Sequence, residues 1–228
     1  MFDQALAHLL TIAWGIWSNR NEIRTGGPRK SASVIASWTK DYLEEFQLMN
    51  HKVQAKKPKI EVGWSLPHLP WFKINVDGAV FEKQRSVGIG VVIRDHLGLV
   101  RVALSMKIHA LLGLLETEAK AMVEGIRFAW DRGISIAIFK GDSMVVYHSL
   151  IGSATPPSSI FNMISGSLLQ ATSFSECMFS IVPRNGNKVA HGLAQHAKDL
   201  AGSCTWIGEI PCFIEQLVSH DVLFSSSF

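Results

Sequence analysis

The sequence has little of several features that would decide a protein's class at once. It holds three cysteines in 228 residues, and none of them forms a C-x-x-C pair. The odd number and the missing C-x-x-C spacing argue against a disulfide framework and against a zinc site, so we expect a reducing compartment, the cytoplasm or the nucleus. The apolar run at residues 6–17 is too short to span a bilayer and follows no basic segment, so it is neither a membrane helix nor a signal peptide. We therefore predict a soluble intracellular protein with no membrane partner.

Charge of either sign is also scarce, and the formal net charge is only +3. Residues 1–60 hold 9 Lys and Arg against 5 Asp and Glu, whereas the remaining residues hold 13 against 14. The basic excess is thus confined to the N-terminal part. Two interpretations stay open: a segment that lies along phosphates, or an ordinary solvated segment.

Composition and periodicity divide the chain into four parts. Apolar residues recur at helical spacing in residues 3–19 and again in residues 34–49, which predicts a helical N-terminal arm over residues 1–50. Residues 51–70 are rich in lysine and proline and are interpreted as a linker. A compact domain is expected over residues 71–200 and a C-terminal tail over residues 201–228.

The pattern of apolar residues and turns in residues 71–200 predicts an α/β fold. Three strands at its start form an antiparallel meander, and helices then alternate with two further strands. We expect a mixed five-stranded sheet with helices on its faces. Gly88 and Gly90 continue a strand instead of opening a helix, so they indicate close backbone approach or a bulge and not a dinucleotide site.

Carboxylates stand at three places that such a fold can bring together, namely Asp77 in the first strand, Glu118 at the start of the first helix and Asp142 after the fourth strand. Open α/β sheets bind ligands at strand ends. Read singly, each residue has a simpler explanation: Asp77 as a hairpin turn with Gly78, Glu118 as a partner of the helix dipole, and Asp142 as a helix cap. The three together favour a metal or catalytic site.

These residues lie in motifs that resemble ribonuclease H of type 1, and most closely the plant domains related to the tails of non-LTR retrotransposon polyproteins. The matching stretches are NVDGA (75–79), GIGVVIRD (88–95), ETEAKAMVEGI (116–126), GDS (141–143) and VPRNGNKVAHGLAQHA (182–197). The resemblance covers about residues 70–200, and IWSNRN (16–21) extends it loosely into the arm.

The resemblance implies endonucleolytic cleavage of the RNA strand of RNA–DNA hybrids by two divalent metal ions, Mg²⁺ or Mn²⁺. Of the four acidic positions that hold these ions, three match as Asp77, Glu118 and Asp142, and the fourth is His191. The expected partner is nucleic acid, either an RNA–DNA hybrid or structured RNA. The residues expected to contact it are Gly78, Ala79, Ser143 and Asn187.

His191 is the departure from the pattern. A neutral imidazole offers one nitrogen and no negative charge, which Mg²⁺ binds poorly and Mn²⁺ accepts more readily. An alternative function is therefore a domesticated retrotransposon relic that binds nucleic acid without cleaving it. Two further interpretations stay open: a structural histidine on the last helix, and a structural α/β domain whose carboxylates meet by accident.

Overall fold

The computed structural model of the chain describes residues 64–225 throughout and, before them, residues 9, 11–13, 15–17, 19–20, 23, 28–37 and 39–40. The chain forms two compact units, Met1–Lys59 and Ile60–Phe228. In the first unit, the described residues between 9 and 23 and between 32 and 40 are helical. The boundary predicted at residue 50 lies outside the described residues. No helix in the described part of the chain combines the length and the apolar character needed to cross a membrane.

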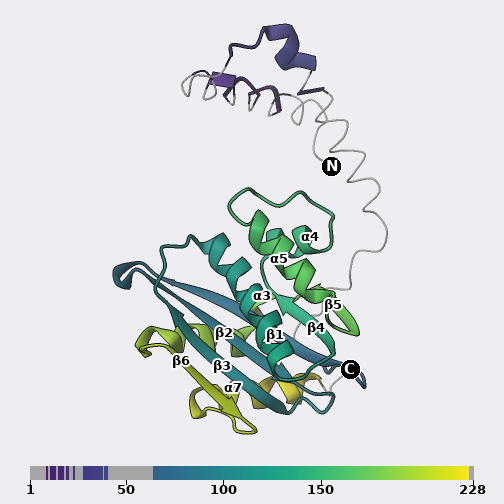
Figure 1. Cartoon of the computed structure of the whole chain (residues 1–228), viewed down its shortest axis with the longest axis vertical. Helices are drawn as coiled ribbons and strands as arrows, with labels where there is room; N and C mark the ends of the chain where they lie inside the picture. Colours follow the sequence, from purple (N-terminus) through teal and green to yellow (C-terminus); the bar gives the residue numbers. More distant parts are fainter. Residues whose placement is uncertain are drawn as a thin grey trace. The chain divides into compact units, whose positions relative to one another are not determined.

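Within residues 64–225, six strands form one mixed sheet (Figure 1). In chain order they are β1 (Phe72–Phe81), β2 (Ser86–Arg94), β3 (Val100–Ile108), β4 (Ile136–Gly141), β5 (Glu176–Ile181) and β6 (Ser203–Ile207). They lie side by side in the order β5-β4-β1-β2-β3-β6. The first three strands form the antiparallel meander, β4 and β5 join β1 in parallel, and β6 pairs antiparallel with β3.

Helices cover both faces of this sheet. The helices are α3 (Leu114–Asp131), α4 (Met144–Leu150) and α5 (Phe161–Ala171) on one face, and α6 (Lys188–His196) and α7 (Cys212–Ser225) on the other. Successive side chains along a strand point to opposite faces. Ile74 and Val76 of β1 therefore lie in the core beneath α3, whereas Asn75 and Asp77 contact residues that begin α6. This division of β1 is the alternation expected of a strand with one face toward each layer of helices.

Helix α6 lies directly against the backbone of β2. A Cβ atom added to Gly90 would clash with the carbonyl oxygen of Ala190 and lie 2.9 Å from the Cβ of Leu193. Glycine is needed here because any side chain would push the helix away from the sheet. The close approach predicted for the β2 glycines is confirmed, and it brings Asn187 and His191 to β1.

The sheet has one strand more than the five that were predicted, because residues 203–207 form β6. Along β6 the side chains alternate only between exposed and half-buried, so its pattern lacks the apolar run that identifies a buried strand. Pairing across the edge of β3 forms this strand. Helix α7 follows, and its Ile214 and Val218 are buried in the same cluster as Val189 and Leu193 of α6. The described part of the expected tail therefore lies in the second compact unit.

The last residues of the expected linker also contact the sheet. Residues 51–63 lie outside the described residues, but Trp64 is only 5% exposed. Its indole Nε1 donates a hydrogen bond to Oδ1 of Asn75 at 3.2 Å. The sheet therefore buries a residue that precedes its first strand by eight positions.

Candidate metal centre

The acidic site lies where β1 runs past the end of β4. Strand β1 pairs with β4 only over residues 72–75, opposite residues 137–140. Asp77 follows two residues after the last of these pairs, and Asp142 follows directly after Gly141, the last residue of β4. Both carboxylates therefore lie beside the carboxyl end of β4.

Helix α3 brings Glu118 to the same place. Gly78 allows the approach, because a Cβ atom there would lie 2.7 Å from Cγ2 of Thr117 and 2.9 Å from its carbonyl oxygen. Ligand oxygens of Asp77, Glu118 and Asp142 all lie within 4.8 Å of one another. The three carboxylates that were expected to share a site therefore come together, each from a different element.

The geometry excludes the simpler explanation of each carboxylate. Asp77 lies inside β1 and not in a hairpin turn. Helix α3 begins at Leu114, so the acidic residue of its first turn is Glu116 rather than Glu118. The cap of α4 is Ser143 and not Asp142. None of the three carboxylates is thus explained by the local structure of its own element.

Burial and mutual repulsion disfavour negative charge in this cluster. Burial raises the pKa of Glu118 to about 8, and repulsion by Asp77 and Asp142 adds to the effect while Arg184 opposes it. Burial likewise raises the pKa of Asp77 to about 6, against the hydrogen bond from His191. A cation among these oxygens would favour their charged forms.

His191 adjoins the cluster but does not belong to it. Its Nδ1 lies 2.8 Å from Oδ2 of Asp77, and its side chain is 59% exposed. Over the described residues, the group of ligand atoms that lie within 4.8 Å of one another contains the three carboxylates and not His191. His191 therefore contacts one predicted ligand, and its role as a fourth metal ligand stays a prediction.

Residues predicted to contact nucleic acid surround the same carboxylates, but most of them also have a structural task. Gly78 permits the approach of α3, as described above, and Ala79 is 4% exposed. Oγ of Ser143 accepts a hydrogen bond from the backbone nitrogen of Val146 at 3.5 Å. Asn187 is 1% exposed, and its Nδ2 donates to Oδ1 of Asp77 at 3.3 Å. Contact of these four residues with nucleic acid stays a prediction.

Sequence reasoning missed two polar residues near the site. Nε of Arg184 lies 3.4 Å from Oδ2 of Asp142, and the Arg184 side chain is 90% exposed. Asn75 is fully buried and donates to Asn187 at 3.0 Å. Strand alternation puts Asn75 on the same face as Asp77, which was a signal for its role, whereas nothing in the local pattern singled out Arg184.

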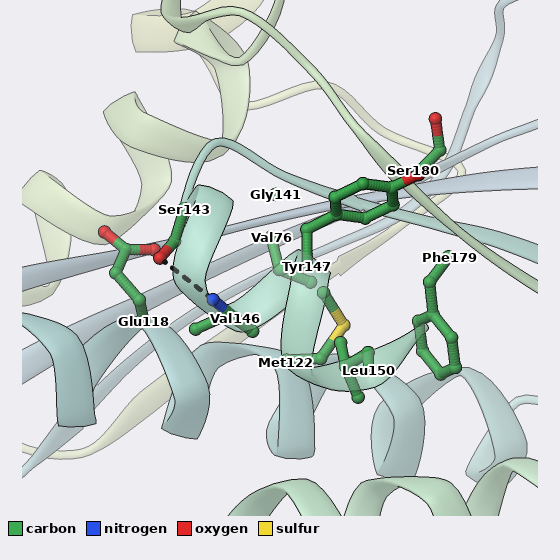
Figure 2. A pocket seen from close by; sticks show the side chains of 10 residues that line it. All are labelled: Val76, Glu118, Met122, Gly141, Ser143, Val146, Tyr147, Leu150, Phe179 and Ser180. Atoms are coloured by element: carbon green, nitrogen blue, oxygen red, sulfur yellow. Dashed lines mark hydrogen bonds between the residues drawn. The ribbon is translucent and has the colours of Figure 1, made fainter. Parts of the chain in front are cut away.

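A small pocket borders the acidic cluster at Glu118 (Figure 2). Its lining residues are Val76, Glu118, Met122, Gly141, Ser143, Val146, Tyr147, Leu150, Phe179 and Ser180. Figure 2 shows Glu118 and Ser143 at one end and the rings of Tyr147 and Phe179 at the other. Glu118 is the only carboxylate in this lining, so the pocket brings no further acidic residue to the cluster.

A mixed sheet that begins with an antiparallel meander and gathers three carboxylates at a strand end has the architecture predicted for a ribonuclease H-like domain. The sequence model of the family described as reverse transcriptase-like matches residues 75–197, which is just over half of the chain. The chain therefore belongs to the reverse transcriptase-like family. The resemblance to ribonuclease H of type 1 is confirmed by the comparisons that follow.

The chain is 27% identical over 184 residues to a candidate ribonuclease H protein of Arabidopsis thaliana, a match that covers 78% of this chain and 29% of that protein. This chain thus spans less than a third of the length of that relative. Among solved structures, RNase H1 from the archaeon Halobacterium salinarum matches with a TM-score of 0.54 and 22% identity over 57% of this chain and 98% of that chain. LC11-RNase H1 in complex with an RNA/DNA hybrid matches with a TM-score of 0.51 and 19% identity over 56% and 96%. These structures confirm the fold.

Proposed function

We propose that this protein binds nucleic acid and cleaves the RNA strand of RNA–DNA hybrids in a reaction that depends on divalent metal ions. The observation that carries the proposal is the cluster of Asp77, Glu118 and Asp142, whose ligand oxygens lie within 4.8 Å of one another. Membership of the reverse transcriptase-like family supports it. Further support comes from LC11-RNase H1, which has a similar fold and was solved with an RNA/DNA hybrid.

The donor set fits a divalent ion. Mg²⁺ and Mn²⁺ favour carboxylate oxygens, and the three carboxylates supply them from separate elements. The raised pKa values of Asp77 and Glu118 reflect burial and the repulsion between neighbouring carboxylates, which a dication would relieve. Asp77, Glu118 and Asp142 would hold the metal. When two such ions are bound, they acidify a water molecule and stabilise the charge that develops on phosphate and leaving oxygen.

The chain's own side chains prepare Asp77 for this task. Its Oδ1 accepts a hydrogen bond from Asn187 and its Oδ2 contacts His191, so both oxygens have a partner that restricts rotation of the carboxylate. Arg184 adds an exposed positive charge at the edge of the cluster, beside Asp142. A phosphate that approaches the cluster would meet this guanidinium, which suits bidentate binding of phosphate oxygens.

The proposed substrate is recognised by shape and not by sequence. An RNA strand is distinguished from DNA by its 2′-hydroxyl, and the deep major groove of an A-like helix offers little access to base edges. Backbone contacts near Gly78 and Ala79 would lie along the sugar–phosphate chain. We therefore expect weak sequence specificity.

A second function, binding of nucleic acid without cleavage, is favoured by one observation. His191 occupies the fourth acidic position of the family pattern, yet it contacts only Asp77 among the three carboxylates and adds no negative charge. A site that lacks the fourth carboxylate is expected to hold a second Mg²⁺ weakly.

One gel assay separates these functions. The purified full chain is incubated with an RNA–DNA hybrid labelled on the RNA strand, in Mg²⁺, in Mn²⁺ or in EDTA, and binding is followed in parallel by mobility shift. Cleavage of the RNA strand that EDTA abolishes supports the enzyme, with Asp142→Asn as the variant that loses it. A shift without cleavage in either metal supports the binding protein. If the protein neither cleaves the hybrid nor shifts its mobility, both functions are refuted.

A further inference from the structure

A network of buried polar side chains connects helix α7 to the metal centre along the face of the sheet that α6 and α7 cover. Its members are Asp221 (6% exposed), Arg94 (0%), Trp64 (5%), Asn75 (0%), Asn187 (1%) and Asp77 (4%). They come from α7, β2, the segment before β1, β1 itself and the start of α6. Buried polar groups are costly unless each has a partner, so a connected set of this depth needs a reason.

The end of this polar network at α7 is a buried ion pair. Nη1 of Arg94 donates to Oδ2 of Asp221 at 2.8 Å. The guanidinium carbon of Arg94 lies 3.8 Å from the centre of the Trp64 ring, which is a stacking distance. Removing one member of a buried ion pair leaves the other charge uncompensated, so Asp221 and Arg94 depend on each other. The guanidinium is thereby held in one place.

The position of the Arg94 guanidinium fixes the orientation of the Asn75 amide. Its Oδ1 accepts hydrogen bonds from Nε1 of Trp64 at 3.2 Å and from Nη2 of Arg94 at 3.4 Å. Two donors on the oxygen side leave the NH₂ group to point the other way, where it donates to Oδ1 of Asn187 at 3.0 Å. A flipped Asn75 would turn its NH₂ group toward two other donors.

The orientation of the Asn187 amide is fixed in the same way. Because its Oδ1 accepts from Asn75, its NH₂ group faces the carbonyl oxygen of Val76 at 2.9 Å and Oδ1 of Asp77 at 3.3 Å. A flipped Asn187 would turn a carbonyl oxygen toward the carboxylate of Asp77, where two acceptors repel. The donor that Asp77 receives is therefore set by groups on α7, on β2 and in the segment before β1.

We infer that Arg94, held by Asp221 and Trp64, is a positioning residue for the metal ligand Asp77, acting through Asn75 and Asn187. This inference rests on the proposed function of the acidic cluster. Trp64 and Asp221 lie outside residues 75–197, the part of the chain that matches the family. The segments on both sides of the family's domain thus complete the site.

The test removes the donors without leaving a buried charge. Trp64→Phe deletes the indole N–H and keeps an aromatic ring over the guanidinium, and Arg94→Met with Asp221→Leu replaces the ion pair by apolar groups. The triple variant leaves Oδ1 of Asn75 with neither donor. The matched control is Ile214→Ala, which loosens the packing of α7 in its apolar cluster and leaves every member of the polar network unchanged. All proteins are the full chain, and their unfolding midpoints are compared first.

Two measurements then decide. In metal-free protein, hydrogen exchange of the Asn187 side-chain amide is followed by NMR, and in a separate titration the dissociation constant for Mn²⁺ is measured by electron paramagnetic resonance. The triple variant is expected to exchange the Asn187 amide faster and to bind Mn²⁺ about 10-fold or more weakly, the usual effect of losing an outer-shell partner. Trp64→Phe alone, which keeps the ion pair, should move both values in the same direction by less.

The control separates positioning from general loosening. Ile214→Ala should leave the amide exchange and the Mn²⁺ constant near those of the wild type. Equal changes in both proteins, or an unchanged Asn187 amide in the triple variant, would overturn the inference. A wild-type protein that binds no Mn²⁺ would refute the proposed metal centre instead, while the amide exchange would still decide whether Arg94 sets the orientation of Asn187.

Discussion

Replacing Glu118 by Gln should stabilise the metal-free protein and weaken its response to metal. Glu118 is crowded by burial and by two carboxylates, which raise its pKa to about 8 from an ordinary value of 4.5. Gln keeps the shape of the side chain but cannot be ionised. The substitution therefore removes a group that must either take up a proton on folding or carry an unfavourable charge and, in the presence of Mg²⁺, a metal ligand.

The sign and size of the effect follow from the two pKa values. Below about pH 4.5 Glu118 is protonated in both the folded and the unfolded protein, so it contributes nothing there. Between pH 4.5 and 8 the folded protein holds a proton that the unfolded protein has lost, and stability falls as the pH rises. At about 1.4 kcal/mol per pH unit, the penalty that Gln removes is on the order of 3 kcal/mol at pH 7. For a domain of this size that corresponds to roughly 6–12 °C in melting temperature.

The assay is thermal unfolding in EDTA at several pH values, repeated with Mg²⁺. The gain of Glu118→Gln over the wild type should be small near pH 4, grow toward pH 8, and shrink or reverse when Mg²⁺ is added. Glu116→Gln is the matched control, since Glu116 lies on the same helix, in its first turn, and outside the cluster. A gain that is independent of pH, or equal in both variants, would refute the argument that Glu118 belongs to a repulsive metal site.

Three other predictions concern the site and its support. Asp142→Asn should abolish cleavage of the RNA–DNA hybrid while its melting temperature stays unchanged or rises, and cleavage at the wild-type rate would contradict the site. His191→Asp should raise Mg²⁺-supported cleavage and His191→Ala should lose the advantage of Mn²⁺ over Mg²⁺; an unchanged rate and metal preference in His191→Asp would show that this position is not used. Gly90→Ala should lower the free energy of unfolding by at least about 2 kcal/mol in urea, because its Cβ meets the backbone of α6. Gly166→Ala, in the open on α5, should be neutral or slightly stabilising, and equal effects of the two would refute the close approach.

Local sequence patterns were enough to predict the order of the elements and the face of β1 that each side chain takes. Strand alternation and helical spacing involve only near neighbours along the chain, so they assign Ile74 and Val76 to the core and Asp77 to the opposite face. The same patterns, with the motifs around them, led to Glu118 and Asp142. The fold brings these three carboxylates together because the parallel pairing of β1 and β4 ends just before them.

The surroundings of these carboxylates depend on tertiary contacts. The place of His191 beside Asp77, and outside the cluster, depends on how closely α6 approaches β2, which its own helical pattern does not encode. Strand β6 forms through its pairing with β3, and the Arg94–Asp221 pair joins positions 127 residues apart. Periodicity reports the neighbours of a residue along the chain. Ion pairs, raised pKa values and edge-strand pairing depend instead on neighbours across the fold, which is why they emerged only from the three-dimensional arrangement.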